Sequence, residues 1–110
     1  MNDDEATGDR IRAALAGKPS IREVPMFGGL SFMVNGKMVA AVGRDGNLIL
    51  RVDPGRNREL LMYPGASPAE MGKGRRMGPG WVAVAAEALA NDGLSFWIGV
   101  ALEYNATTTR

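Results

Sequence analysis

The chain contains no cysteine and no histidine among its 110 residues. Without cysteine it has no disulfide, no thiolate nucleophile and no thiolate ligand for zinc. Without histidine it also lacks an imidazole general base. Carboxylate, lysine, tyrosine, serine and threonine groups remain for catalysis, and no two carboxylates stand at a spacing that indicates acid–base chemistry. We therefore predict a protein without enzymatic activity, metal or cofactor.

An excess of charge of one sign is also lacking, as are long apolar runs. The 13 basic and 12 acidic residues give a net charge of +1, so no global field directs the protein toward nucleic acid or anionic lipid. No apolar run approaches the roughly 18 residues that span a membrane. The acidic start, Met1 to Glu5, is unlike a signal or transit peptide. We expect a cytoplasmic protein.

What the sequence does contain is a strong hairpin signal between residues 26 and 38. A Gly-Gly pair leads into an apolar stretch, Asn35-Gly36 reverses the chain, and a second apolar stretch follows at once. Asn-Gly between two such stretches is typical of a two-residue hairpin turn. With that turn, Met33 faces Met38 and Phe32 faces Val39.

A second turn around Asp45-Gly46 extends the hairpin to a third strand. It is expected to place Val42 opposite Ile49 and Ala40 opposite Arg51. Strict alternation then sorts the side chains to two sides of the sheet. The first side holds Leu30, Phe32, Val34, Val39, Ala41, Leu48, Leu50 and Val52. The second side holds Ser31, Met33, Met38, Ala40, Val42, Ile49 and Arg51.

Both sides are largely apolar, whereas a simple two-layer sheet leaves one side polar. The second side therefore needs a cover, either another helix or a partner chain. We take Met33, Met38, Ile49 and Arg51 as candidate partner-binding residues. Arg51 is the one charge of the three strands on that side. The alternative for Arg51 is a structural role, extending to water or pairing with an acid at the edge of the core.

The remaining patterns complete an α+β fold: an antiparallel sheet of about five strands with N-terminal, middle and C-terminal helices, in a single domain covering residues 1–110. The expected elements are a helix from Asp3 to about Ala16, a strand over 21–26, a helix from Asp53-Pro54 to near Tyr63, a long loop over 64–80, a strand over 81–85, a helical turn over 87–90 and a helix from Leu94 to about Tyr104.

A glycine-rich stretch over 71–80 contains the densest basic cluster. It lacks the Lys-Ser or Lys-Thr of a phosphate-binding P-loop, because Gly74 follows Lys73. Its cations can contact phosphate, although no aromatic residues alternate with them to stack on bases. The alternative is a solvated loop. The candidate nucleic-acid-binding residues are Arg56, Arg58, Lys73, Arg75 and Arg76.

Over nearly its whole length the chain resembles the N-terminal domain of the TfoX (Sxy) competence-regulator family. The resemblance is carried by the segments Met26-Phe27-Gly28-Gly29, Phe32-Met33-Val34-Asn35-Gly36-Lys37-Met38, Leu48-Ile49-Leu50-Arg51-Val52, Pro64-Gly65-Ala66 and Gly80-Trp81-Val82. It implies the same α+β fold. Two-domain members of the family are positive regulators of competence genes and work with a cyclic-AMP-responsive activator. Their C-terminal helical domain has no counterpart in these 110 residues.

The resemblance implies a regulatory role and supplies no catalytic residue. Two functions follow as hypotheses. In the first, the chain is a non-enzymatic interaction module linked to transcriptional or competence regulation, whose partner is another protein or a second copy of itself in a homodimer. In the second, it binds nucleic acid through its basic loop and the two arginines of the middle helix.

Overall fold

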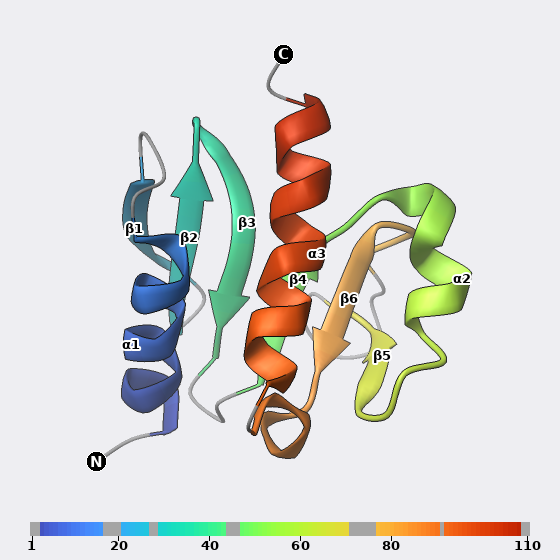
Figure 1. Cartoon of the computed structure of the whole chain (residues 1–110), viewed down its shortest axis with the longest axis horizontal. Helices are drawn as coiled ribbons and strands as arrows, with labels where there is room; N and C mark the ends of the chain where they lie inside the picture. Colours follow the sequence, from blue (N-terminus) through green and yellow to red (C-terminus); the bar gives the residue numbers. More distant parts are fainter. Residues whose placement is uncertain are drawn as a thin grey trace.

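The computed structural model describes residues 3–16, 21–26, 29–43, 47–70, 77–90 and 92–108. Within these ranges the elements are α1 (Asp3–Leu15), β1 (Ile21–Met26), β2 (Gly29–Val34), β3 (Lys37–Val42), β4 (Leu48–Arg51), η1 (Pro54–Arg56), α2 (Asn57–Leu60), β5 (Ala66–Pro68), β6 (Trp81–Val84), η2 (Ala86–Leu89) and α3 (Gly93–Thr108). The strands form one antiparallel sheet in the order β1-β2-β3-β4-β6-β5 (Figure 1). The α+β prediction is confirmed, with six strands instead of about five.

The turn between β2 and β3 is the predicted two-residue hairpin loop. Asn35 has a φ of 54° and Gly36 a φ of 80°, and a type I′ turn requires positive φ at both central residues. Met33 pairs with Met38 beside this turn, as predicted.

Farther from the turn the predicted register is wrong. The pairing shifts between Met33 and Phe32, and Phe32 pairs with Ala40 instead of Val39. Val39 is thus the extra residue of a β-bulge, which moves every following residue of β3 to the other side of the sheet. Ala40 and Val42, predicted on the second side, instead belong to the core, with exposed fractions of 0% and 1%.

Independently of the bulge, the pairing of β3 with β4 is shifted by one residue from the predicted register, and Gly43 N donates a hydrogen bond to Asn47 O where the two strands are joined. Ala40 pairs with Leu50 and Val42 with Leu48, so the predicted pairs of Val42 with Ile49 and Ala40 with Arg51 are wrong. Ala41, which was predicted on the first side, pairs with Ile49 and is half-buried on the second side.

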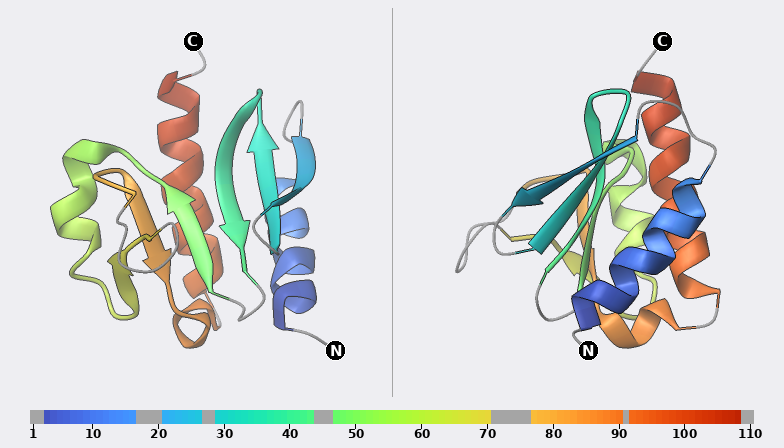
Figure 2. Two further views of the ribbon diagram at one scale, coloured as in Figure 1. Left: turned by 180° about the vertical axis from the view of Figure 1, so that it is seen from behind. Right: turned by 90° about the vertical axis from the view of Figure 1, so that its left-hand side faces the viewer.

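Helices α1 and α3 lie on the same side of the sheet, and the core lies between them and the strands (Figure 2). Trp97, Ile98 and Ala101 of α3 are buried there. On α1, Ile11 and Leu15 are fully buried. Helix α3 continues to Thr108, four residues beyond the expected end at Tyr104.

The segment after β4 begins as predicted and then departs from the expected structure. Asp53 caps a 3-10 turn by accepting a hydrogen bond from Gly55 N at 2.9 Å, and α2 then ends at Leu60 instead of near Tyr63. The segment expected to be a loop contains the short strand β5, which pairs with β6.

The side of the sheet opposite α1 and α3 carries no helix among the described residues. In the view from behind, β4 crosses in front of α3, and no helix lies in front of β2, β3 or β4 (Figure 2, left). We call this side the helix-free face. By register it contains Arg22, Val24, Ser31, Met33, Met38, Ala41, Ile49, Arg51, Trp81 and Ala83.

Candidate functional site

One row of small and medium side chains runs straight across the helix-free face. Val24 pairs with Ser31, Ser31 with Ala41, Ala41 with Ile49, and Ile49 with Ala83. The row therefore crosses five strands, from β1 to β6. Ser31 is buried, with an exposed fraction of 1%, and the other four side chains are half-buried.

Larger side chains lie beside this row, toward the β2–β3 turn. Arg22 pairs with Met33, and Met33 pairs with Met38, while Arg51 pairs with Trp81. The two methionines predicted as partner-binding residues are thus direct cross-strand neighbours. Of the other two candidates, Ile49 lies in the small row, and Arg51 lies two residues farther along β4. All four predicted residues are half-buried and on one face.

Arg51 has an environment that the sequence did not predict. Its guanidinium carbon lies 5.7 Å from the ring centre of Trp81 and 5.8 Å from that of Tyr104. Both distances are within the range of cation–π attraction, about 6 Å. Tyr104 belongs to α3, on the other side of the sheet, and β3 and β4 pair only as far as Leu50. The guanidinium therefore lies between Trp81, which the register assigns to the helix-free face, and Tyr104 of the helix layer, at the end of β4 where β3 and β4 are no longer paired.

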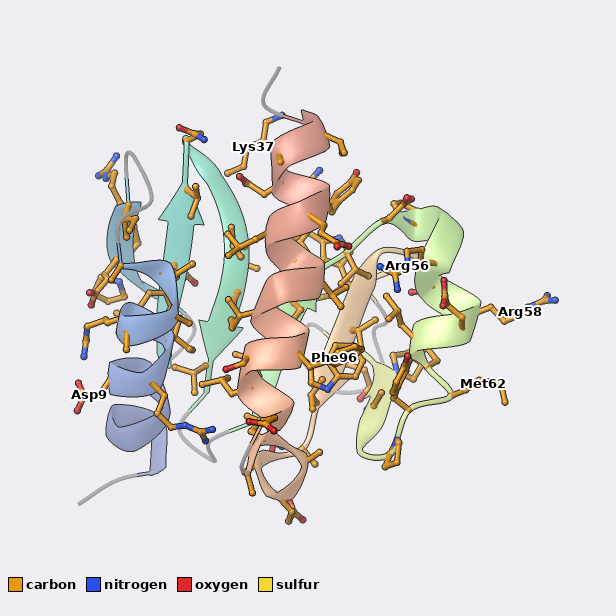
Figure 3. All side chains as sticks on the ribbon, in the orientation of Figure 1. Asp9, Lys37, Arg56, Arg58, Met62 and Phe96 are labelled. Atoms are coloured by element: carbon orange, nitrogen blue, oxygen red, sulfur yellow. The ribbon has the colours of Figure 1, made fainter. Side chains whose placement is uncertain are left out.

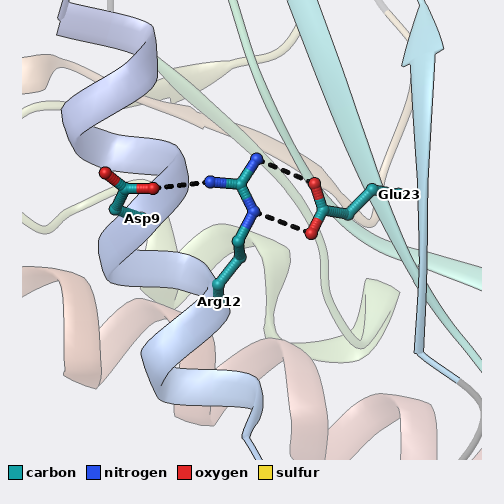
Figure 4. A network of polar contacts seen from close by, with 3 residues as sticks. All are labelled: Asp9, Arg12 and Glu23. Atoms are coloured by element: carbon teal, nitrogen blue, oxygen red, sulfur yellow. Dashed lines mark hydrogen bonds and ion pairs between the residues drawn. The ribbon is translucent and has the colours of Figure 1, made fainter.

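The ion pairs that hold β1 lie on the helix side of the sheet. Arg12 of α1 donates to both carboxylate oxygens of Glu23, at 2.7 and 2.8 Å, and also to Asp9 at 2.6 Å (Figure 4). The hydrogen bonds from Arg12 lower the pKa of Glu23. Because Glu23 points toward α1, its neighbour Arg22 points to the helix-free face.

Arg22 and Trp81 were not among the predicted site residues. Alternation along the predicted strand over 21–26 would have placed Arg22 on the same side as Val24, once β1 was paired with β2. The pairing of Trp81 with Arg51 could not be predicted from neighbouring residues, because α2 and β5 separate β4 from β6 in the sequence.

The candidates for nucleic-acid binding are only partly within the described chain. Lys73, Arg75 and Arg76 lie outside the described residues. Arg56 is ion-paired with Glu59 at 3.0 Å and with Glu103 at 3.4 Å, and the hydrogen bond to Glu59 raises its pKa. Arg58 points away from α2 and is exposed (Figure 3).

A pocket of about 180 Å³ lies beside α2, near strands β6 and β5 at the edge of the sheet. Ligand pockets usually measure about 300–1,000 Å³. The side-chain oxygen of Asn57 in its lining accepts a hydrogen bond from Gly80 N at 3.1 Å. The residues lining it are Asn57, Leu61, Pro68, Gly78, Pro79 and Trp81.

Two kinds of feature are absent from the described part of the chain. No three Asp or Glu side chains there are grouped so that they could hold a metal ion. Within the same ranges, no helix combines the length and the apolar character needed to cross a membrane.

The geometry defines a small α+β domain: one antiparallel sheet with helices on one side and an apolar, arginine-bearing face on the other. The model of the TfoX N-terminal domain matches residues 13–104 of the chain. The chain therefore belongs to the TfoX N-terminal domain family, as its motifs predicted. Comparison with curated proteins and with solved structures gave no match.

Proposed function

We propose that this chain is a regulatory protein-interaction module without catalytic activity, which acts in the cytoplasm and binds a partner protein through its helix-free face. The observation that carries the proposal is the apolar character of that face, over which no described helix lies. The solvated face of an antiparallel sheet normally alternates to polar side chains. Here Met33, Met38 and Ile49 stand at those positions.

The residue types on this face also support binding. Methionine side chains are flexible and polarisable, so a paired Met33 and Met38 can adapt to the shape of a partner. Membership of the TfoX N-terminal domain family, whose two-domain members regulate competence genes, supports a regulatory role for the interaction.

The chain has a second exposed apolar surface, and the test must distinguish the two. Tyr63 and Phe96 are 41% and 39% exposed, with ring centres 5.0 Å apart. Met62, the residue before Tyr63, is 82% exposed and points away from Phe96 (Figure 3). Apolar side chains exposed singly are ordinary on protein surfaces. Met62 therefore serves as a built-in control for Met33 and Met38.

The experiment selects displayed random peptides on the immobilised full chain and maps the binders by NMR of methyl-labelled methionine. Binders are expected to shift the signals of Met33 and Met38 and to leave Met62 unchanged. Met38→Glu should weaken binding at least about tenfold, because it buries a charge in the interface. Met62→Glu is the matched control and should bind normally.

Two outcomes would overturn the proposal. One is a selection that enriches no peptide, and the other is binders that shift Met62 alone. If the free chain sediments as a dimer that Met38→Glu dissociates, the partner is a second copy of the chain bound through the same face.

A further inference from the structure

Within the described residues, two aromatic rings hold Arg51 in place and no group accepts a hydrogen bond from it. Contact with the rings of Trp81 and Tyr104, at 5.7 and 5.8 Å from their centres, attracts the positive charge and restricts the side chain. Rings supply no conventional acceptor for the five N–H groups of a guanidinium. No described residue accepts a hydrogen bond from Arg51 or forms an ion pair with it.

A half-buried guanidinium with unpaired donors is suited to one kind of ligand. Its planar fork matches the two oxygens of a carboxylate, and such bidentate pairs are among the stronger hydrogen bonds in proteins. The aromatic contacts fix the side chain before the ligand arrives, which reduces the entropy lost on binding.

The charged side chains that the register of the described strands assigns to the helix-free face are both positive. Arg22 and Arg51 both belong to it, whereas Glu23, the nearest described acid along β1, is turned toward Arg12. The two arginines stand on strands three places apart in the sheet, or about 14 Å at the usual strand spacing. A single small anion cannot touch both, but a peptide segment lying across the strands can.

The side chains between the arginines indicate a protein segment and not a nucleic acid. A phosphate backbone is bound by successive cations, and the bases by stacking on aromatic rings. Between Arg22 and Arg51 lie Met33 and Met38 instead, which fit apolar side chains.

We propose that the partner protein presents an apolar segment carrying at least one Asp or Glu side chain, and that Arg51 binds this carboxylate through its N–H groups. The proposal rests on the function proposed above and specifies the chemistry of the partner at the same face.

The experiment compares two displayed peptide libraries against the full chain. One has Asp or Glu at fixed positions among apolar residues, and the other has Asn or Gln at the same positions. The acidic library is expected to enrich peptides that shift the methyl signals of Met33 and Met38. Replacing the acid by its amide in such a peptide should weaken binding at least about tenfold.

Variants of the chain then assign the carboxylate to Arg51. Arg51→Gln should weaken the binding of the acidic peptide by a similar factor. On this variant, replacing the acid of the peptide by its amide should leave the affinity nearly unchanged, as in a double-mutant cycle. Arg51→Lys keeps the charge but loses the planar fork, so it should also bind more weakly. Arg58→Gln removes an exposed arginine outside the face and is the matched control.

Thermal unfolding of each variant detects a loss of folding, since Arg51 also contacts Trp81 and Tyr104. The substitution on the peptide side leaves the chain intact, so the carboxylate is tested even if Arg51→Gln does not fold.

The outcomes separate this inference from the proposed function. If the amide library yields binding peptides as often as the acidic library, and these peptides shift the methyl signals of Met33 and Met38, the face binds protein and the carboxylate inference is wrong. If neither library yields a peptide that shifts the methyl signals of Met33 and Met38, both the carboxylate inference and the proposed function are wrong. A DNA strand that binds the same face more tightly than the acidic peptides at low salt, and does so through Arg51, would overturn the inference in favour of nucleic acid.

Discussion

Single glycines set how closely backbone segments approach in this chain, and Gly29 at the start of β2 is the clearest case. A Cβ atom at Gly29 would lie 2.0 Å from Val42 O and 3.0 Å from Gly43 Cα. Both are backbone atoms of the paired strand, which cannot move aside without breaking the sheet. We expect Gly29→Ala to destabilise the fold by about 3 kcal/mol or more and to lower Tm by about 10 °C or more, measured by calorimetry.

Gly99 in the middle of α3 is the control for this substitution. No atom outside its own helix backbone lies within 4 Å of a Cβ built there, and alanine is favoured over glycine in a helix by about 0.5–1 kcal/mol. Gly99→Ala should therefore leave Tm unchanged or raise it. Equal melting of the two variants would contradict the close contact at Gly29.

At the same scale, the sequence predicts the turn of the hairpin but not the bulge beside it. Asn35-Gly36 is predictable because few other residues adopt positive φ in succession. The bulge at Val39 is hidden because residues 38–42 are all apolar, so alternation cannot show where an extra residue is inserted. Met33 and Met38 lie on the turn side of the bulge, so it does not affect their predicted face. Ile49 was still placed on the correct face, because the shift in the pairing of β3 with β4 offsets the shift made by the bulge.

Helix α1 is tied to the edge strand β1 by the pair Arg12–Glu23, and this contact makes a pH-dependent contribution. Glu23 has a lowered pKa in the folded chain because Arg12 donates hydrogen bonds to it. Its stabilisation is therefore present above the pKa of the unfolded chain, about 4.3, and is lost as the pH falls through the lower folded pKa. The side chains are 44% and 35% exposed, so we expect less than about 1 kcal/mol.

Urea unfolding of Glu23→Gln at several pH values checks this contribution. The variant should be less stable than the parent chain at neutral pH, and the two should converge once Glu23 is protonated. Glu70→Gln alters an exposed carboxylate with no ion pair in the described chain and should not reproduce this pattern. A stability gap that persists at the acid end would show that the substitution acts through something other than charge.

Elements that depend on distant contacts are the ones the sequence could not predict. Strand β5 has three residues and ends at Pro68, so it has no periodicity of its own and exists by pairing with β6. The end of α3 is supported from the hairpin: Lys37 donates to Thr108 O, and Asn105 donates to Val34 O at 3.2 Å. The aromatic environment of Arg51 was hidden for the same reason, since Tyr104 comes from the last helix.

Across the whole molecule, the nearly balanced charge is unevenly distributed between the two sides. The carboxylates that form ion pairs within the described chain, those of Asp9, Glu23, Glu59 and Glu103, are engaged with Arg12 and Arg56. The charged residues that the register assigns to the helix-free face are Arg22 and Arg51. A net charge of +1 thus conceals a face whose described charges are both positive, a distribution that is complementary to an acidic partner.

This distribution makes a prediction about self-association. Two copies joined by a twofold axis present the same patch to each other, so pairing through the helix-free face would bring Arg22 and Arg51 against a second set of arginines without carboxylates from that face. We expect sedimentation velocity at physiological salt to show a monomer of 11.7 kDa as the concentration is raised, with any association strengthened by high salt, which screens the repulsion. Arg51→Glu removes part of this repulsion, so it should associate no more weakly than the parent chain. A parent dimer that this variant dissociates would show that the face pairs with itself, and that each Arg51 finds a carboxylate on the other copy.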